Sequence, residues 1–264
     1  MLDLDGTCID SETLFLHPRV RDAVRAATRH VPVIIATGRM YRSALPWCRE
    51  LHVTTPAVCY QGAMVREQPN PNGSGRTLLE ERLAVAAATR ALHVARGHDW
   101  HVQVYRDDEL FCEQDRPEAH YYTSIAQVPI TFVDDLEPLL QSGVTKMLCV
   151  IMDPSEVARC MATMSAALRH AAHITRSLPQ FVEIVSPKVS KAAACDVVCK
   201  RLSVDLAQSV AIGDSLNDIE VLDAAGYAVA ISSSPRAVLA HADATCERPR
   251  NAGVADALAA LNLC

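Results

Sequence analysis

Two aspartates, Asp3 and Asp5, stand on either side of Leu4 near the start of the chain and are followed by Gly6 and Thr7. A carboxylate facing a phosphoryl group can attack it as a nucleophile, provided that a cation offsets the repulsion between the two anions. A second carboxylate two residues on can protonate the leaving alcohol and then activate water. The stretch DLDGT therefore predicts phosphoryl-transfer chemistry, and an acidic turn at a strand end is the alternative.

A second acidic stretch, GDSLND, contains Asp214 and Asp218 and follows the apolar run SVAI. Ligands bind at the carboxyl ends of the strands in open parallel sheets, so both acidic stretches should meet at one sheet edge. Carboxylates crowded there would repel one another unless a cation lay among them. Their oxygen atoms suit a hard divalent ion, and the sequence predicts an Mg2+ site formed by Asp3, Asp5, Asp214 and Asp218.

Two further segments are candidates for binding a phosphate group. In ATGR, Thr37 offers a hydroxyl and Gly38 a backbone N–H close to an expected helix start. Lys191 begins the expected helix at SKAAA, where the helix dipole disfavours a positive charge unless anions lie nearby. Lys188 is a competing candidate in the preceding loop. Taken singly, these segments could also be an ordinary turn and an exposed lysine.

Composition excludes some classes of partner. The chain has 264 residues, of which 50% are hydrophobic and 21% charged, so a folded core is expected throughout. The formal net charge of -6 and the scattered basic residues argue against nucleic acid as a partner. No apolar run approaches the roughly 20 residues that span a bilayer, and no basic, apolar signal segment opens the chain. We expect a cytoplasmic protein without membrane contact.

The ten cysteines are expected to be reduced thiols. They are dispersed without a CxxC pair, and most lie in apolar stretches where a thiol acts as a small hydrophobic side chain. Cys195 and Cys199 share a helix face, but two ligands do not make a zinc site.

The elements that must position these residues follow from hydrophobic periodicity. Helical and strand patterns alternate over residues 1–65 as β-α-β-α-β, with PAVCYQGAMV as the last strand, and alternate again after residue 186. This alternation predicts an α/β fold, a Rossmann-like core with a parallel sheet. The core should comprise residues 1–65 and 186–264.

A different pattern separates these halves. The loop-like stretch EQPNPNGSGR at 67–76 precedes a helix at about 84–97, alternating strands and a helix opening with DPSEVARC. In that helix Val157, Met161, Met164 and Leu168 form an apolar stripe, which predicts core packing. Residues 66–185 are therefore expected to form an inserted α+β domain.

The ordered motifs DLDGT, TGR, VSK and GDSLND resemble those of the haloacid dehalogenase-like phosphatase superfamily, and the insertion resembles the α/β cap of its Cof-type members. The resemblance spans nearly the whole chain. It implies that Asp3 is the phosphorylated nucleophile, that Asp5 is the general acid and base, and that the cap closes over the core and selects the substrate.

The same resemblance implies the roles of the remaining site residues. Asp214 would bind Mg2+, the backbone carbonyl of Asp5 would add a ligand, and Asp218 would support the metal from outside its ligand shell. Asn217 would fix the phosphoryl group or the lysine. The expected phosphate-binding residues are Leu4, Thr37, Gly38, Lys191 and Asn217.

Three departures from the family pattern bear on substrate geometry and stability. Only Met1 and Leu2 precede the nucleophile, where members usually carry a full apolar strand. Gln61 stands where Asn generally precedes Gly-Ala, and the usual glycine before Val-Ser-Lys is missing. Strand residues absent at this position would cost the sheet hydrogen bonds and core contacts.

These observations predict an Mg2+-dependent phosphatase for a small phosphorylated metabolite such as a sugar phosphate, nucleotide or flavin-type phosphate. The alternatives are a phosphomutase of the same superfamily and a catalytically impaired protein that binds phosphorylated ligands. In the insert, His101, Tyr105 and Arg106 are candidates for contacting the leaving group, and the remaining histidines are expected at the surface. The sequence leaves the oligomeric state open.

Overall fold

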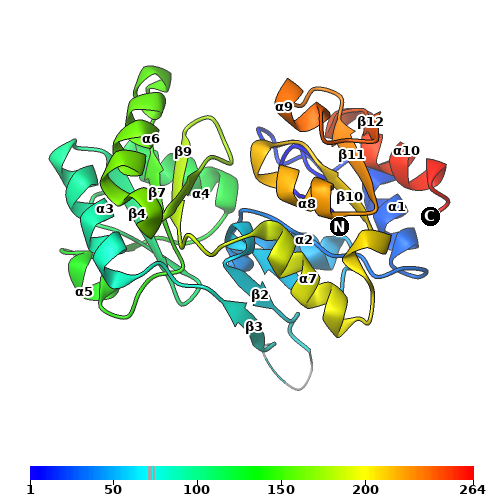
Figure 1. Ribbon diagram of the computed structural model, residues 1–264, viewed down its shortest axis with the longest axis horizontal. Coiled ribbons are helices and arrows are strands. Elements are labelled where there is room, and N and C mark those ends of the chain that lie inside the picture. The colour runs from blue at the N-terminus through cyan, green and yellow to red at the C-terminus, as the bar shows by residue number, and fades with distance from the viewer. Residues whose placement is uncertain (71–72, 74) are drawn as a thin grey trace. The chain divides into compact units, whose positions relative to one another are not determined.

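The computed structural model describes residues 1–70, 73 and 75–264 and divides the chain into two compact units (Figure 1). We call Met1–Leu79 with Ser190–Cys264 the core unit, and Glu80–Val189 the inserted unit. Among the described residues, no helix combines the length and the apolar character needed to cross a membrane.

The core unit is built on a largely parallel sheet. Strands β10 (Val210–Gly213), β11 (Tyr227–Ile231) and β12 (Ala244–Cys246) pair in parallel. Parallel bridges continue the sheet from Ile212 to Leu2, from Leu2 to Ile35, and from Ala36 into β1 (Ala57–Cys59). The predicted α/β class with a parallel core sheet is confirmed.

The short segment before Asp3 occupies the middle of this sheet. The backbone N–H of Leu2 donates to Ile34 O at 2.9 Å, and that of Asp3 donates to Ile212 O at 3.1 Å. This short segment is therefore hydrogen-bonded to a strand on each side, which fixes the direction in which the chain leaves the sheet at Asp3. A cavity of about 320 Å³ lies beside Met1, lined mostly by apolar side chains that include Val33, Ile34, Cys199, Leu202, Val210 and Leu258.

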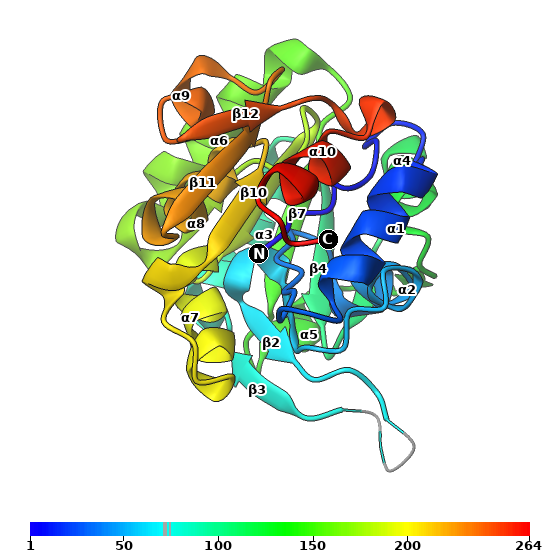
Figure 2. The ribbon, with the colours of Figure 1, turned by 90° about the vertical axis from the view of Figure 1, so that its right-hand side faces the viewer.

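Helices cover both faces of the core sheet (Figure 2). Helices α7 and α8 pack through an apolar cluster that includes Ala194, Val198 and Val221, while α1 packs against α10 on the other side. The helices of the core unit are α1 (Pro18–Ala27), α2 (Tyr41–Glu50), α7 (Lys191–Arg201), α8 (Ile219–Ala224), α9 (Arg236–Leu239) and α10 (Gly253–Ala260). Its 3-10 turns are Tyr60–Gly62, Leu206–Gln208, Leu216–Asp218 and Pro249–Asn251.

The prediction of one strand over PAVCYQGAMV is wrong. The segment forms β1, the turn Tyr60–Gly62 and β2 (Met64–Arg66), which runs antiparallel to β1. The chain reverses because Tyr60, Gln61 and Gly62 all have positive φ angles. Strand β3 (Thr77–Glu80) follows the predicted loop at 67–76, of which residues 71, 72 and 74 lie outside the described residues.

The inserted unit holds a six-stranded sheet in the order β6-β5-β4-β7-β9-β8. Helices α3 and α6 cover one face of this sheet (Figure 1), and the predicted stripe is largely confirmed because Val157, Met164 and Leu168 are buried there. The elements are β4 (His101–Arg106), β5 (Glu109–Cys112), β6 (Thr131–Phe132), β7 (Lys146–Val150), β8 (His173–Thr175), β9 (Phe181–Val185), α3 (Val85–Gly97), α4 (Pro117–Ala126), α5 (Glu137–Leu140), α6 (Pro154–Leu168) and the 3-10 turn Arg169–Ala171.

All ten cysteines are free thiols, as predicted. Eight are buried, Cys246 is half-buried and Cys264 is exposed. The buried thiols fill core positions, as small hydrophobic side chains do.

Candidate active site

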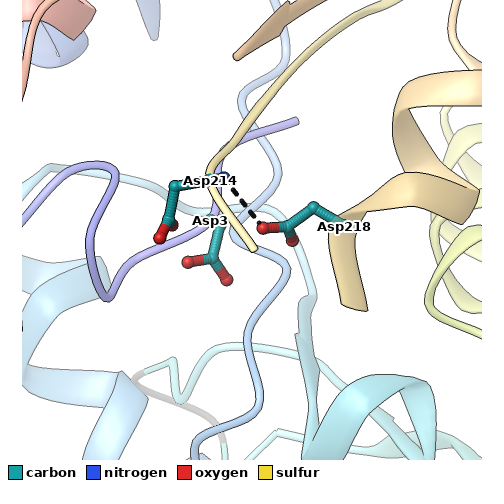
Figure 3. A group of neighbouring side chains, drawn as sticks. All are labelled: Asp3, Asp214 and Asp218. Carbon is teal, nitrogen blue, oxygen red and sulfur yellow. Dashed lines mark hydrogen bonds between the residues drawn. The ribbon is translucent and has the colours of Figure 1, made fainter. Parts of the chain in front are cut away.

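Three carboxylates converge at the carboxyl edge of the core sheet (Figure 3). Asp3 follows Leu2, Asp214 follows β10, and Asp218 lies in the turn that leads into α8. One oxygen of each carboxylate lies within 4.8 Å of one oxygen of each of the other two. The parallel pairing of Leu2 with Ile212 brings them together, since it aligns the two strand ends.

Lys191 supplies a positive charge inside this cluster. It is the first residue of α7 and only 2% exposed, and its Nζ donates to Asp3 Oδ1 at 2.8 Å and to Asp218 Oδ1 at 2.5 Å. These two anions offset the unfavourable helix dipole at this position. Lys188, the competing candidate, is exposed and lies in the loop.

Some of the other carboxylate oxygens in the cluster accept hydrogen bonds, and some do not. Asp218 Oδ2 accepts from the backbone N–H groups of Asp214 and Ser215 at 3.0 Å, and Thr7 donates to Asp214 Oδ1 at 2.8 Å. Within the described part of the chain, Oδ2 of Asp3 and Oδ2 of Asp214 accept no hydrogen bond. Asp218 therefore holds the surrounding backbone and Lys191 in place through hydrogen bonds, while Asp3 and Asp214 each have one oxygen available to a ligand.

Burial and crowding shift the pKa values of this cluster. Desolvation raises the pKa of Asp3 to about 7 against the opposing effect of Lys191, and the charge of Asp218 raises it further. Desolvation and the neighbouring carboxylates Asp3 and Asp218 also raise the pKa of Asp214 well above its usual value. Burial alone would lower the pKa of Lys191, but Asp218 and Asp3 raise it. One ammonium group does not neutralise three carboxylates, of which Asp3 and Asp218 are buried and Asp214 is half-buried, so the site favours an additional cation.

The carboxylate of Asp5 is oriented differently, toward Arg39. Arg39 Nε donates to Asp5 Oδ2 at 2.7 Å and Nη2 to Asp5 Oδ1 at 2.6 Å, a bidentate ion pair with a buried guanidinium. The same guanidinium donates to Ser43 Oγ at 3.0 Å and lies over the Trp47 ring. Sequence reasoning missed this role of Arg39, although the residue belongs to the TGR motif and its i+4 neighbour is Ser43.

The expected phosphate-binding residues occupy adjacent positions of the same edge. Thr37 directly follows the bridge residues Ile35 and Ala36, and its buried hydroxyl accepts from the backbone N–H of Arg39 at 3.2 Å. Gly38 is covered by the side chain of Gln61. Leu4 is fully buried, so it can offer a ligand only its backbone.

Asn217 lies in the turn before α8 and is held at both ends of its amide. Its Nδ2 donates to Gln61 Oε1 at 2.8 Å, and its Oδ1 accepts from Ser215 Oγ at 2.5 Å. Among the described residues, this amide makes no hydrogen bond to Lys191. The residues singled out at the strand ends therefore lie at one edge of the sheet, with the Asp5 side chain turned toward Arg39.

The candidates in the inserted unit make internal contacts. His101 and Tyr105 are buried, Tyr105 donates its hydroxyl proton to Gln103 Oε1 at 2.8 Å, and Arg106 donates to Leu139 O at 3.2 Å. Desolvation lowers the pKa of His101 to about 4, which keeps this ring neutral. Their contact with a leaving group stays a prediction.

Comparison with known proteins identifies a single family over the chain. The family model described as haloacid dehalogenase-like hydrolase matches residues 1–258. A phosphoglycolate phosphatase of Haloarcula marismortui is 26% identical over 265 residues, covering 98% of this chain and 95% of the relative. An HMP-PP phosphatase of Cronobacter sakazakii is 24% identical over 241 residues, covering 90% of this chain and 85% of the relative.

The fold has counterparts among solved structures. A haloacid dehalogenase-like hydrolase from Bacteroides thetaiotaomicron superposes with a TM-score of 0.86 at 23% identity, covering 98% of this chain and 97% of that chain. The agreement extends over both units of the chain.

Proposed function

The chain belongs to the haloacid dehalogenase-like hydrolases, and on that premise we propose that it is a Mg2+-dependent phosphatase acting through an aspartyl-phosphate at Asp3. The observation that carries this proposal is the convergence of Asp3, Asp214 and Asp218 within 4.8 Å around the buried ammonium of Lys191. The phosphatase names of two relatives support the reaction class.

The donor set fits a hard divalent cation. All three side chains offer carboxylate oxygens, and desolvation, followed by the neighbouring carboxylates, raises the pKa values of Asp3 and Asp214. Asp3 and Asp214 would hold Mg2+ together with the backbone carbonyl of Asp5, and Asp218 would brace Asp214 and Lys191. When bound, Mg2+ would offset the repulsion between Asp3 and the phosphoryl group.

The side chains divide the reaction between them. Lys191 holds Asp3 through Oδ1, so that Oδ2 can attack the phosphorus atom while the bond to the leaving oxygen breaks. Asp5 delivers a proton to that oxygen and later takes one from water, whose oxygen displaces Asp3 from phosphorus. Arg39 occupies both oxygens of the Asp5 carboxylate in an ion pair, so Asp5 has to leave this pair and gain a proton before it can act as the acid. Thr37, Gly38, Lys191 and Asn217 would bind the phosphoryl oxygens.

The substrate class we propose is a small phosphorylated metabolite, such as a sugar phosphate, nucleotide or flavin-type phosphate. The relatives are named for phosphoglycolate and HMP-PP, both small phosphorylated molecules. Release of inorganic phosphate from a panel of such compounds would rank them. Isomer interconversion without phosphate release would instead indicate a phosphomutase.

The mechanism is tested by replacing the nucleophile. We expect an Asp3→Asn variant to lose Mg2+-dependent hydrolysis of an aryl phosphate by at least about 10³-fold, because the amide is a poor nucleophile. The wild-type protein should form an aspartyl-phosphate at Asp3 that survives an acid quench and is visible by mass spectrometry. Exposed Asp134 provides the matched control, since Asp134→Asn removes a carboxylate far along the chain from the motifs. Equal activity in both variants would contradict the mechanism.

A further inference from the structure

The turn Tyr60–Gly62 is strained and buried, although it contributes no residue to the predicted reaction. Tyr60 and Gln61 have φ angles of 53° and 61°, in the left-handed region that side chains other than glycine, asparagine and aspartate rarely adopt. Both residues are at most 4% exposed. Such strain persists where the surroundings enforce it, often at functional sites.

This turn touches three separate segments of the site. The backbone N–H of Tyr60 donates to Arg39 O at 2.9 Å, and that of Gln61 donates to Thr37 O at 3.2 Å. Gly62 packs against the start of α7, so closely that a Cβ atom there would lie 2.5 Å from Ser190 O. The turn is therefore fixed to the loop after Ala36 and to the helix that begins with Lys191.

The side chain of Gln61 adds the third connection. Its Oε1 accepts from Asn217 Nδ2 at 2.8 Å, while its Nε2 lies over Gly38, where a Cβ atom would approach to 2.3 Å. One amide thus spans two expected phosphate-binding residues, Gly38 and Asn217.

We propose that Gln61 is a positioning residue that fixes Gly38 and Asn217 at the separation required to bind a phosphoryl group, an inference that rests on the proposed phosphatase function. Gln61 does not react with the substrate. Its amide holds Asn217 in one orientation and bars any side chain at position 38. The left-handed backbone at Gln61 is the conformation that directs this amide into the site.

Binding of inorganic phosphate in the presence of Mg2+, measured by calorimetry, tests this role without requiring turnover. Loss of one neutral hydrogen bond corresponds to about a three- to tenfold weaker affinity. We expect that weakening in Gln61→Ala and a larger one in Asn217→Ala, which also removes a proposed phosphate-binding side chain. The double variant should bind about as weakly as Asn217→Ala alone, because the contact between the two amides is already lost there. The exposed Gln114 provides a matched control in Gln114→Ala.

A second variant separates positioning from folding. Asparagine adopts left-handed backbone more readily than glutamine, so Gln61→Asn should keep the thermal midpoint within about 2 °C while its shorter amide still weakens phosphate binding. The KM for substrate should rise in parallel. A residue required only for folding would lose affinity only as it loses stability.

Three results would overturn the inference: unchanged phosphate affinity in both Gln61 variants, independent and multiplicative losses in the double variant, or an affinity loss that merely follows the thermal midpoint. Gly38→Ala gives a reciprocal check, since the added methyl should weaken binding less in the Gln61→Ala background. If the proposed phosphatase function were wrong, the result would differ, because the wild-type protein itself would neither bind phosphate nor hydrolyse phosphate esters.

Discussion

At the scale of single residues, the site holds more negative than positive charge. Asp3, Asp214 and Asp218 share one ammonium group, that of Lys191, and desolvation raises the pKa of Asp3 to about 7. Between pH 3.8 and about pH 7, the Asp3 carboxyl group is protonated in the folded state but ionised in the unfolded state. Without metal, its contribution to stability is therefore present below the unfolded pKa near 3.8 and is lost as the pH rises through about 7.

The pH dependence of the Asp3 contribution predicts how Mg2+ should affect stability. Protons compete with the cation for the same carboxylates, so Mg2+ should raise the thermal midpoint more at pH 8 than at pH 5.5, by about 3 °C or more. Thermal unfolding with Mg2+ and with a chelator at both pH values measures the difference. In Asp214→Asn the benefit of Mg2+ should shrink at both pH values. An equal benefit for the wild type at the two pH values would contradict a metal site at Asp3.

The residue types of the site could be predicted because the motifs place them directly after apolar runs. The structure brings Asp3, Asp214, Asp218 and Lys191 into contact as that placement suggests, while their catalytic roles stay predictions. The pairing of Asp5 with Arg39 was missed. Spacing alone does not show which of several oxygens a guanidinium will contact, because that depends on side-chain rotamers.

At the scale of elements, periodicity predicted most helices and the parallel strands but failed between residues 56 and 66. The apolar pattern continues through Tyr60, yet the backbone reverses there with three consecutive positive φ angles. Hydrophobic patterning reports which residues are buried, and both a strand and a buried turn satisfy it. Gly62 was the single sequence signal of a turn.

The conformation of this turn predicts a specific stability defect. A Cβ atom in Gly62→Ala would lie 2.5 Å from Ser190 O at a residue with φ of +99°, so the backbone must move. We expect a loss of about 2–4 kcal/mol in the free energy of unfolding, measured by denaturant titration. Gly97→Ala is the matched control, because that glycine ends α3 in open space and alanine favours the helix. Equal stability of the two variants would show that the turn is not strained.

At the scale of the whole molecule, the core unit has a cavity beside its central strand. Met1 and Leu2 hydrogen-bond to both neighbours, but a cavity of about 320 Å³ adjoins them between Ile34 and Val210. The cavity is lined mostly by apolar side chains, which therefore lack packing partners on one side.

Filling this cavity from its own wall should therefore stabilise the protein. Val33 is 7% exposed and lines the cavity, so Val33→Ile adds one methylene next to the empty space. A buried methylene contributes about 0.8 kcal/mol, which corresponds to roughly 2–4 °C in the thermal midpoint. The control is Val65→Ile at a fully buried position that does not line the cavity, where the extra methylene should lower the midpoint. Equal midpoints in the two variants would show that the cavity does not accept the added methylene.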